Sequence, residues 1–278
     1  MSQTPRKKTK NVVELEVQRT QRLTPHMVRV VLGGDGIRDF HDNNDSDHYV
    51  KLLFPPEGVT YPEPFDLEAI ERDFPREQQP VKRTYTVRSF DPQAGELTID
   101  FVYHGDVGIA GPWAVAAQPG DKLRLLGPGG KYSPSDEADW HLLVGDESAI
   151  PAIASALERL APGASAHVIL QVEDRQEIQS LSSPAKVKFT WLFRTESELE
   201  NPRSSLVDAV KGFEFPPGQG HLFVHGEAET VMKRIRPHLL KERCVNRDWL
   251  SISGYWRLGN TEERFRQWKA AERTTITA

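Results

Sequence analysis

The chain has 278 residues, and its 35 lysine and arginine residues against 40 aspartate and glutamate residues give a formal net charge of −5. A single cysteine excludes an internal disulfide framework, and it equally excludes a two-iron two-sulfur centre with four thiolate ligands or a cysteine-rich zinc site. The acidic balance gives no indication of nucleic acid as a partner, and no apolar run approaches the ~20 residues of a membrane span. We therefore expect a cytoplasmic protein with no stable membrane association.

The first half of the chain has the pattern of short antiparallel strands. Residues 1–11 are polar and basic, and we expect a flexible tail there. Strand patterns bounded by turn signals follow at 12–17, 26–32, 48–54, 83–88, 97–102 and 122–126. Residues 57–80 are polar and contain several prolines, which predicts a long surface excursion. Short strands with little helix predict a small antiparallel barrel.

After about residue 135 the pattern changes to strands that alternate with helices. Residues 140–145 are continuously apolar, as in a strand buried on both faces, and apolar residues then recur at helical spacing from Ile150 to Leu160. Further strands are predicted at 167–172, 187–193, 221–224 and 249–253, and further helices at 204–211, 227–241 and 261–272. This alternation predicts an open parallel sheet, so the expected fold is a β-barrel followed by an α/β domain.

One predicted barrel strand, Arg83 to Arg88, carries side chains that suit a flavin. Tyr85 offers a ring for the isoalloxazine system, and the Thr86 hydroxyl offers a donor for its polar edge. Arg83 offers a planar fork for a phosphate group. The same six residues also fit an exposed amphipathic strand with two surface arginines, and this segment alone does not decide between the two interpretations.

A glycine-rich segment follows the next predicted strand. Gly105, Gly108 and Gly111 surround the start of a predicted helix at 112–117, and free N–H groups at a helix start suit a diphosphate. The spacing is not that of the dinucleotide fingerprint of a Rossmann fold. His104 fits a cofactor contact and a structural role equally, and Trp113 fits a core position as well as a cofactor contact.

Six motifs carry a family resemblance. They are R-T-Y-T-V-R at 83–88, D-F-V-Y-H-G at 100–105, G-I-A-G-P-W-A at 108–114, G-P-G-G-K at 127–131, G-D-E-S-A-I-P-A at 145–152 and G-Y-W-R-L-G-N-T-E-E at 254–263. With them the chain resembles the siderophore-interacting proteins, which are FAD-dependent ferric-siderophore reductases of the ferredoxin–NADP reductase superfamily. The resemblance implies a six-stranded antiparallel FAD-binding barrel over 12–134. It also implies a parallel-sheet NAD(P)-binding domain over 135–278, with a C-terminal helix.

The resemblance also implies which residues hold FAD without a covalent bond. Residues on the first motif strand would flank the isoalloxazine and the nearby ribityl or phosphate groups: Arg83, Thr84, Tyr85, Thr86 and Val87. Asp100, Val102 and His104 would line the adenosine side. The diphosphate turn would comprise Gly108, Ala110, Trp113 and Ala114.

The second domain would present NADPH or NADH at the carboxyl ends of its strands. The expected contacts are Asp146, Ser148, Ala149 and Trp256. Asp146 would accept a hydrogen bond from a flavin or ribose hydroxyl, but capping of the following helix by Asp146 and Ser148 fits the sequence equally well. Arg175 and Arg194 are candidates for a 2′-phosphate, and neither decides between NADPH and NADH.

The expected substrate is an anionic ferric siderophore, whose docking site should be basic. By the resemblance, Lys51, Lys131 and Arg257 would form this site, although each alone also fits a solvated surface cation. Lys131 stands where we expect arginine in some family members, which replaces a planar fork by a point charge. No resident metal site is expected, because the nine histidines lack metal-ligand spacing.

Two other functions stay open at this point. One is a general NAD(P)H:flavin or ferredoxin-linked reductase, for which a ferredoxin would be the partner. The other is a non-catalytic ferric-siderophore binding protein. Hydrolysis is disfavoured, because the chain lacks Gly-x-Ser-x-Gly and Cys244 lies in a charged stretch. We expect a monomer, in which the helix at 261–272 influences the choice of reductant.

Overall fold

The computed structural model describes residues 12–197, 200–260 and 264, and these form two compact units. The first unit holds the described chain up to Gln21, with Val28–Asn44 and His48–Gly130. The second holds Arg22–Met27, Asp45–Asp47 and the described chain from Lys131 onward. The expected tail at 1–11 lies outside the described residues, and so does the expected helix at 261–272 apart from Arg264.

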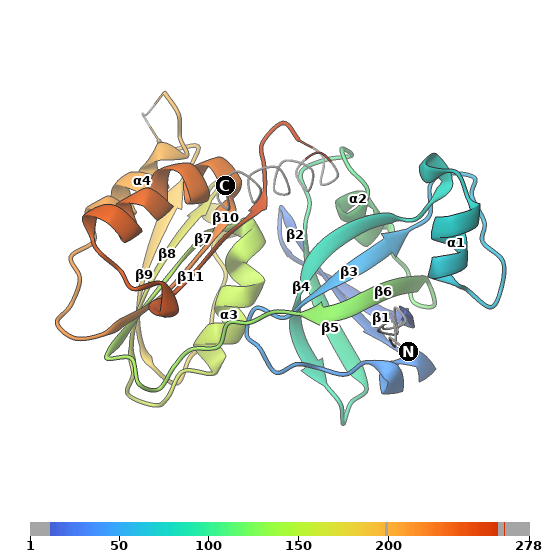
Figure 1. The fold of residues 1–278 in the computed structure, drawn as a ribbon, viewed down its shortest axis with the longest axis horizontal. Coiled ribbons are helices and arrows are strands. Elements are labelled where there is room, and N and C mark those ends of the chain that lie inside the picture. Colours follow the sequence, from blue (N-terminus) through green and yellow to red (C-terminus); the bar gives the residue numbers. More distant parts are fainter. Residues whose placement is uncertain (1–11, 198–199, 261–263, 265–278) are drawn as a thin grey trace, which may run out of the picture. The chain divides into compact units, whose positions relative to one another are not determined.

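The first unit contains a closed six-stranded barrel, which confirms the predicted fold of this half (Figure 1). Its strands are β1 (Val12–Thr24), β2 (Met27–Gly33), β3 (Tyr49–Phe54), β4 (Val81–Asp91), β5 (Glu96–Val102) and β6 (Lys122–Gly129). Their order is β1-β2-β5-β4-β3-β6, and antiparallel pairing of β6 with β1 closes the barrel. Two 3-10 turns, η1 (Asp35–Asp39) and η2 (Arg76–Gln78), lie between strands.

Alternation along the strands places the barrel core. In β1, Val13, Leu15 and Val17 are buried, whereas Glu14 and Glu16 between them are not. Apolar side chains from all six strands fill the interior in the same way, and helix α2 (Ala110–Ala116) packs its small residues against them.

Residues 57–80 are more than the surface excursion predicted from the sequence. They contain helix α1 (Leu67–Asp73), whose N-terminus is capped by the Asp66 carboxylate and whose Leu67 and Ile70 are buried. A helix of two turns shows only two buried apolar positions, and this is too little periodicity to stand out among the surrounding prolines.

The second unit contains a five-stranded parallel sheet, as predicted. Its strands are β7 (Trp140–Asp146), β8 (Ser165–Val172), β9 (Lys186–Phe193), β10 (Gly220–Glu227) and β11 (Leu250–Trp256). Their order is β11-β10-β7-β8-β9, so the winding direction reverses between β7 and β10. The carboxyl ends of parallel strands share one edge, and a ligand is expected outside that edge near the reversal.

Helices cover both faces of this sheet, which explains the continuous burial of β7. Helix α3 (Ile150–Glu158) packs with Leu143 and Phe223 on one face. Helix α4 (Ser204–Lys211) and the π-helical turn η5 (Glu229–Ile235) pack with Leu142 and Val224 on the other. A second π-helical turn, η6 (His238–Glu242), follows η5, so the helix predicted at 227–241 forms with wider turns than an α-helix.

Candidate functional site

In the first unit, an aromatic cluster lies where β4, β5 and α2 meet. The Tyr85 ring packs on Phe101 with ring centroids 4.5 Å apart, and Trp113 lies 5.7 Å from both Phe101 and Phe54. Tyr85 and Trp113 are only half-buried, so the edge of this cluster reaches solvent. A flat apolar group such as a flavin ring system has an aromatic surface to contact there.

The other β4 residues predicted to bind the cofactor differ in whether their side chains can reach a ligand. Val87 is fully buried in the barrel core and Thr86 is nearly so, and the strand pairing with β5 shifts just beyond them, between Val87 and Ser89. Thr84 is exposed, and Arg83 is half-buried with its guanidinium donating to the Lys82 carbonyl at 3.0 Å. Val87 is therefore limited to backbone contacts with a ligand, whereas Arg83, Thr84 and Tyr85 can use their side chains.

The start of α2 has the features of a phosphate cradle. A Cβ added at Gly111 would lie 2.9 Å from the Val102 carbonyl oxygen, so glycine permits a close approach of the helix to β5. Gly108 has φ +98° and open space beside it, and among the described residues no side chain caps the helix at Ile109. Ala110 and Ala114 are buried in the core, so Ala110 can offer a ligand only its backbone N–H, whereas Ala114 lies beyond the first turn, where the N–H groups bond within the helix. The donor set therefore fits the diphosphate of FAD.

The three residues predicted to contact adenosine differ in burial and in their hydrogen-bond partners. Asp100 is buried and forms a bidentate ion pair with Arg29 of β2, at 2.7 and 2.8 Å. His104 is exposed and Val102 is half-buried. Arg29 was not expected at this site, since no sequence signal links strand positions 71 residues apart. The adenosine role of Asp100 stays a prediction, and it would have to operate with Arg29 already paired.

In the second unit, the buried Asp146 carboxylate links three strand ends. One oxygen accepts from the Ser148 backbone N–H at 3.0 Å and from its hydroxyl at 2.5 Å. The other accepts from the Glu227 N–H at 2.8 Å and from the Trp256 indole N–H at 2.9 Å. These bonds join the carboxyl ends of β7, β10 and β11. The sequence fits two roles for Asp146, a ligand contact and a cap of the following helical turn. The bond from the Ser148 N–H is that of a cap.

Two glycines let the backbone pack closely around Asp146 and Ala149. A Cβ at Gly226, which has φ +147°, would lie 2.7 Å from the same carboxylate oxygen that binds Trp256. Ala149 is fully buried and packs against Gly145, where an added Cβ would be 2.4 Å away. Burial, and the nearby Glu147, raise the pKa of Asp146 above its ordinary value. Ser148 and Trp256 are the half-buried members of the predicted set, and the Ser148 hydroxyl can still turn to a ligand.

Trp256 is held from two sides at the end of β11. Besides its bond to Asp146, its ring lies under the Arg203 guanidinium at 5.5 Å. Two residues later the Leu258 N–H lies 3.4 Å from a carboxylate oxygen of the buried Glu227. Arg257 therefore stands on a segment that is anchored on both sides.

The two arginines considered for a 2′-phosphate are both paired with carboxylates. Arg175 pairs with Glu196 at the surface, at 2.7 and 3.0 Å. Arg194, at the end of β9, pairs with both Glu147 and Glu173.

The three predicted docking cations are divided between the units. Lys51 is exposed on β3 of the first unit, while Lys131 and Arg257 belong to the second. The Lys131 backbone N–H donates to Asp47 at 2.8 Å, which orients the start of this segment. That these cations act on one substrate stays a prediction.

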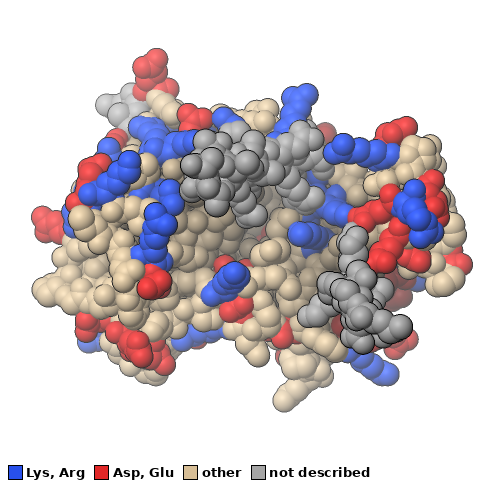
Figure 2. Space-filling model, in the orientation of Figure 1, with Lys and Arg blue, Asp and Glu red and all other residues tan. Residues whose placement is uncertain are grey.

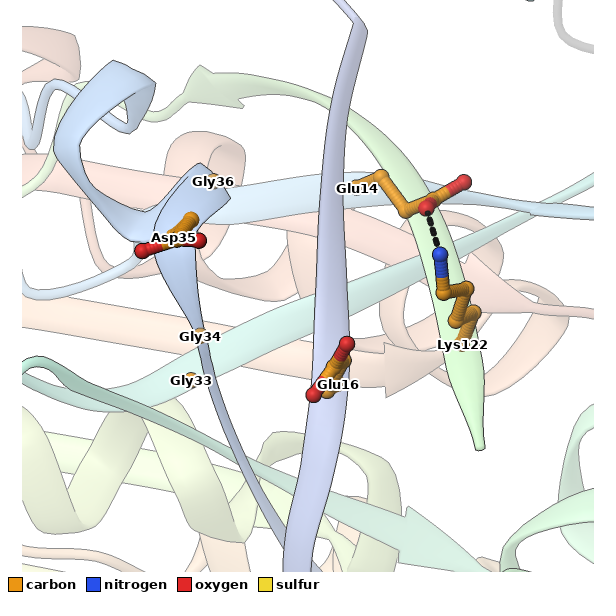
Figure 3. Close-up of a pocket in the computed structure, with 7 residues that line it drawn as sticks. All are labelled: Glu14, Glu16, Gly33, Gly34, Asp35, Gly36 and Lys122. Atoms are coloured by element: carbon orange, nitrogen blue, oxygen red, sulfur yellow. Dashed lines mark hydrogen bonds and ion pairs between the residues drawn. The ribbon is translucent and has the colours of Figure 1, made fainter. Parts of the chain in front are cut away.

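A pocket of about 380 Å³ lies elsewhere on the first unit, between β1 and η1 (Figure 3). It is lined by Glu14, Glu16, Asp35 and Lys122 with three glycines, and Lys122 bonds to Glu14 at 2.9 Å. Three carboxylates against one paired lysine disfavour an anionic ligand there. On the face drawn in Figure 2, basic and acidic side chains are interspersed.

Within the described ranges, no helix is long and apolar enough to cross a membrane. The same residues contain no group of three or more His, Cys, Asp and Glu side chains arranged to hold a metal ion.

Two family models cover most of the chain. Residues 16–132 match the siderophore-interacting FAD-binding domain, and residues 138–259 match the siderophore-interacting protein domain. The chain belongs to the siderophore-interacting protein family, and the resemblance based on the six motifs is confirmed.

Relatives that match nearly end to end agree with this family. An uncharacterized protein of Mycobacterium tuberculosis is 45% identical over 91% of this chain and 93% of its own length. Ferric vibriobactin reductase ViuB of Vibrio cholerae is 34% identical over 91% and 92%. The NADPH-dependent ferric-chelate reductase of Escherichia coli is 31% identical over 87% and 92%.

Solved structures confirm the fold class. A siderophore utilization protein from T. fusca is 38% identical, with a TM-score of 0.77 over 90% of this chain and 94% of that protein. A ferredoxin NADP+ reductase from Neisseria gonorrhoeae shares the fold at 15% identity, with a TM-score of 0.59 over 88% and 99%. The expected ferredoxin reductase-like architecture is therefore the observed one.

Proposed function

We propose that this chain is an FAD-dependent ferric-siderophore reductase that uses a nicotinamide coenzyme as its electron donor. The cradle at β4, β5 and α2 carries the proposal, because it combines an aromatic surface, an arginine and uncapped helix amides in the FAD-binding half of the family. Reductases of ferric vibriobactin and other ferric chelates among the relatives support the choice of substrate.

The residues of this chain would bind and orient rather than transfer protons. FAD, when bound, would supply the redox chemistry, since a flavin can accept a hydride and donate single electrons. Arg83 and the amides at the start of α2 would bind the FAD phosphates, and Tyr85 would pack beside the ring system. The carboxyl edge of the second-unit sheet would bind the coenzyme.

The proposed substrate is an anionic Fe(III) complex of a catecholate or hydroxycarboxylate siderophore. Lys51, Lys131 and Arg257 would attract and orient it, each as a cation against oxygen-rich ligands. Reduction releases the metal, because Fe(II) binds hard oxygen ligands far more weakly than Fe(III).

A visible spectrum followed by anaerobic turnover tests the proposal. We expect flavin bands in the purified protein, bleaching on addition of NADH or NADPH, and Fe(II) formation when a ferric catecholate is then added. A protein without flavin bands and without chelate-dependent coenzyme oxidation would overturn the proposal.

Two further measurements, reduction of free flavin and tryptophan fluorescence with added chelate, separate the two rival functions. A general flavin reductase would be purified without FAD and would reduce free flavin faster than ferric chelates. A non-catalytic binding protein would show chelate-dependent quenching of tryptophan fluorescence without coenzyme oxidation.

The proposal places the enzyme in the cytoplasm as a monomer, in keeping with its single cysteine. A reduced ferredoxin is a further candidate donor, because FAD can accept single electrons. Light scattering during size-exclusion chromatography tests the oligomeric state, and ferredoxin-driven chelate reduction without nicotinamide tests the donor.

A further inference from the structure

One arginine at the carboxyl edge of the sheet is held by two carboxylates. Arg194 follows β9, and its two terminal nitrogens donate to the two carboxylate oxygens of Glu147. The bond from Nη1 to Oε2 is 3.1 Å long. Its Nε donates to Glu173 at 2.9 Å. Both edges of the guanidinium that suit a planar anion are therefore occupied.

Exposure distinguishes the two carboxylates. The side chains of Arg194 and Glu147 are 15% and 10% exposed, whereas that of Glu173 is 45% exposed. A ligand can therefore reach Arg194 by displacing Glu173 but not by displacing Glu147. The cluster has two negative charges against one positive charge, so its formal charge is −1.

The cluster lies at the place in the fold where a coenzyme ribose is expected. Glu147, Glu173 and Arg194 follow three adjacent strands, β7, β8 and β9, next to the reversal between β7 and β10. In dinucleotide-binding sheets, a carboxylate after the second strand accepts from the ribose 2′-hydroxyl, whereas an arginine receives a 2′-phosphate. Here the second strand is β8, and Glu173 is the residue that follows it.

We infer that this chain prefers NADH to NADPH and that Glu173 is the residue that determines the preference; the inference rests on the proposed function. Glu173 accepts a hydrogen bond from a 2′-hydroxyl without leaving Arg194. A 2′-phosphate has to enter a cluster that is already negative and has to replace Glu173 on the guanidinium. Arg175 is no substitute, because Glu196 occupies its fork.

Nucleotide binding to the purified holoprotein tests the inference without relying on turnover. Calorimetric titration with AMP and with 2′-phospho-AMP gives the ratio of the two affinities. We expect the wild-type protein to bind AMP at least about tenfold more tightly, the ratio that one charge-assisted hydrogen bond supplies. Glu173→Gln should reduce the ratio about tenfold, because it removes the competing charge and leaves the volume unchanged.

Glu96→Gln is the matched control, since it makes the same change in a bidentate carboxylate–arginine pair, with Arg19, on the barrel of the first unit. This variant should leave the ratio of the affinities for AMP and 2′-phospho-AMP unchanged. The kcat/KM ratio for NADH over NADPH, measured by hydride transfer to the bound flavin, should follow the same order among the three proteins.

Three results would overturn the inference: tighter wild-type binding of 2′-phospho-AMP, no effect of Glu173→Gln on either ratio, or an equal effect of both variants. Where AMP binds too weakly to measure, the coenzyme ratio decides. A protein that shows these ratios but reduces no ferric chelate would overturn the proposed function alone.

Discussion

Two buried histidines near the amino ends of β7 and β10 give the second unit a pH-dependent stability. His141 is 2% exposed, and burial together with the neighbouring His221 lowers its pKa to about 4, although Asp136 opposes the shift. Burial also lowers the pKa of His221, whose Nδ1 accepts from the Ser135 N–H at 3.1 Å. Both rings are therefore neutral in the folded protein at neutral pH.

We predict that this unit loses stability between pH 6.5 and pH 4. In this window an unfolded His141, with a pKa of 6.5, takes up a proton that the folded side chain does not bind. The unfolded state thus gains protons as the pH falls, and the free energy of unfolding decreases by as much as about 3 kcal/mol.

His141→Gln should remove most of this dependence. Chemical denaturation at pH 7 and pH 5 measures it as a difference in unfolding free energy. The exposed His104 provides the control, and His104→Gln should leave the wild-type difference intact. An equal pH dependence in wild type and His141→Gln would contradict the prediction.

Asp146 shows how much residue type alone indicates about a side chain's role. An acidic residue at the end of a buried strand, followed two residues later by serine, indicates either a ligand contact or a cap. The sequence does not indicate that Trp256 and Glu227 donate to the same carboxylate. Those donors are 110 and 81 residues away, and only the strand order brings them together.

At the scale of elements, α2 and β5 form the closest contact in the FAD cradle. Gly111 is the point of approach, since its missing side chain lets the helix lie against the Val102 carbonyl. The core position of Ala114 and the half-buried ring of Trp113 fix the rest of the helix.

We predict that Gly111→Ala weakens FAD binding at least tenfold and lowers the unfolding free energy by about 1–3 kcal/mol, because the new methyl group forces the helix away from β5. FAD affinity is measured by recovery of flavin fluorescence on release, and stability by denaturation of the apoprotein.

Ala116→Gly serves as the control within the same helix. It costs about 1 kcal/mol of helix propensity but adds no atom against β5. Its FAD affinity should stay within a few fold of wild type. Equal losses of FAD affinity in both variants would show that helix stability, rather than close packing, is the determinant.

At the scale of the whole molecule, recognition of an anionic chelate is a problem of charge distribution. The net charge of −5 disfavours an anion in general, so local cations have to supply the attraction. The proposal assigns this to Lys51, Lys131 and Arg257, which come from both units.

We predict that Lys51→Gln, Lys131→Gln and Arg257→Gln each raise KM for a ferric catecholate about three- to tenfold, and that the wild-type KM rises with ionic strength. Coenzyme oxidation with a neutral quinone acceptor should not change, because no anion has to dock. Lys122→Gln is the control, as Lys122 is an exposed barrel lysine paired with Glu14.

A double-variant cycle asks whether Lys51 and Lys131 act on the same bound chelate. Non-additive effects on KM, with a coupling above about 0.5 kcal/mol, indicate one shared site. Strict additivity would contradict a common docking site, even where each single variant is impaired.

The sequence by itself determined the family, the barrel and the parallel sheet, because these depend on local patterns that a reader can follow along the chain. Alternation marked the β1 strand, the apolar run at 140–145 marked the central strand of the sheet, and short motifs marked the flavin strand and its glycine turn. The helix at 67–73 was not predicted, because its two buried apolar residues do not establish a helical periodicity.

Only the tertiary structure decided which polar and charged side chains bond to each other. Arg29 bonds to Asp100, Asp146 to Trp256, and Arg194 to Glu147 and Glu173, across separations of 21 to 110 residues in the sequence. Pairing depends on strand order and register, and neither leaves a local signal. The single cysteine and the charge of −5 limited the classes of protein, but the order and register of the strands decide which side chains meet.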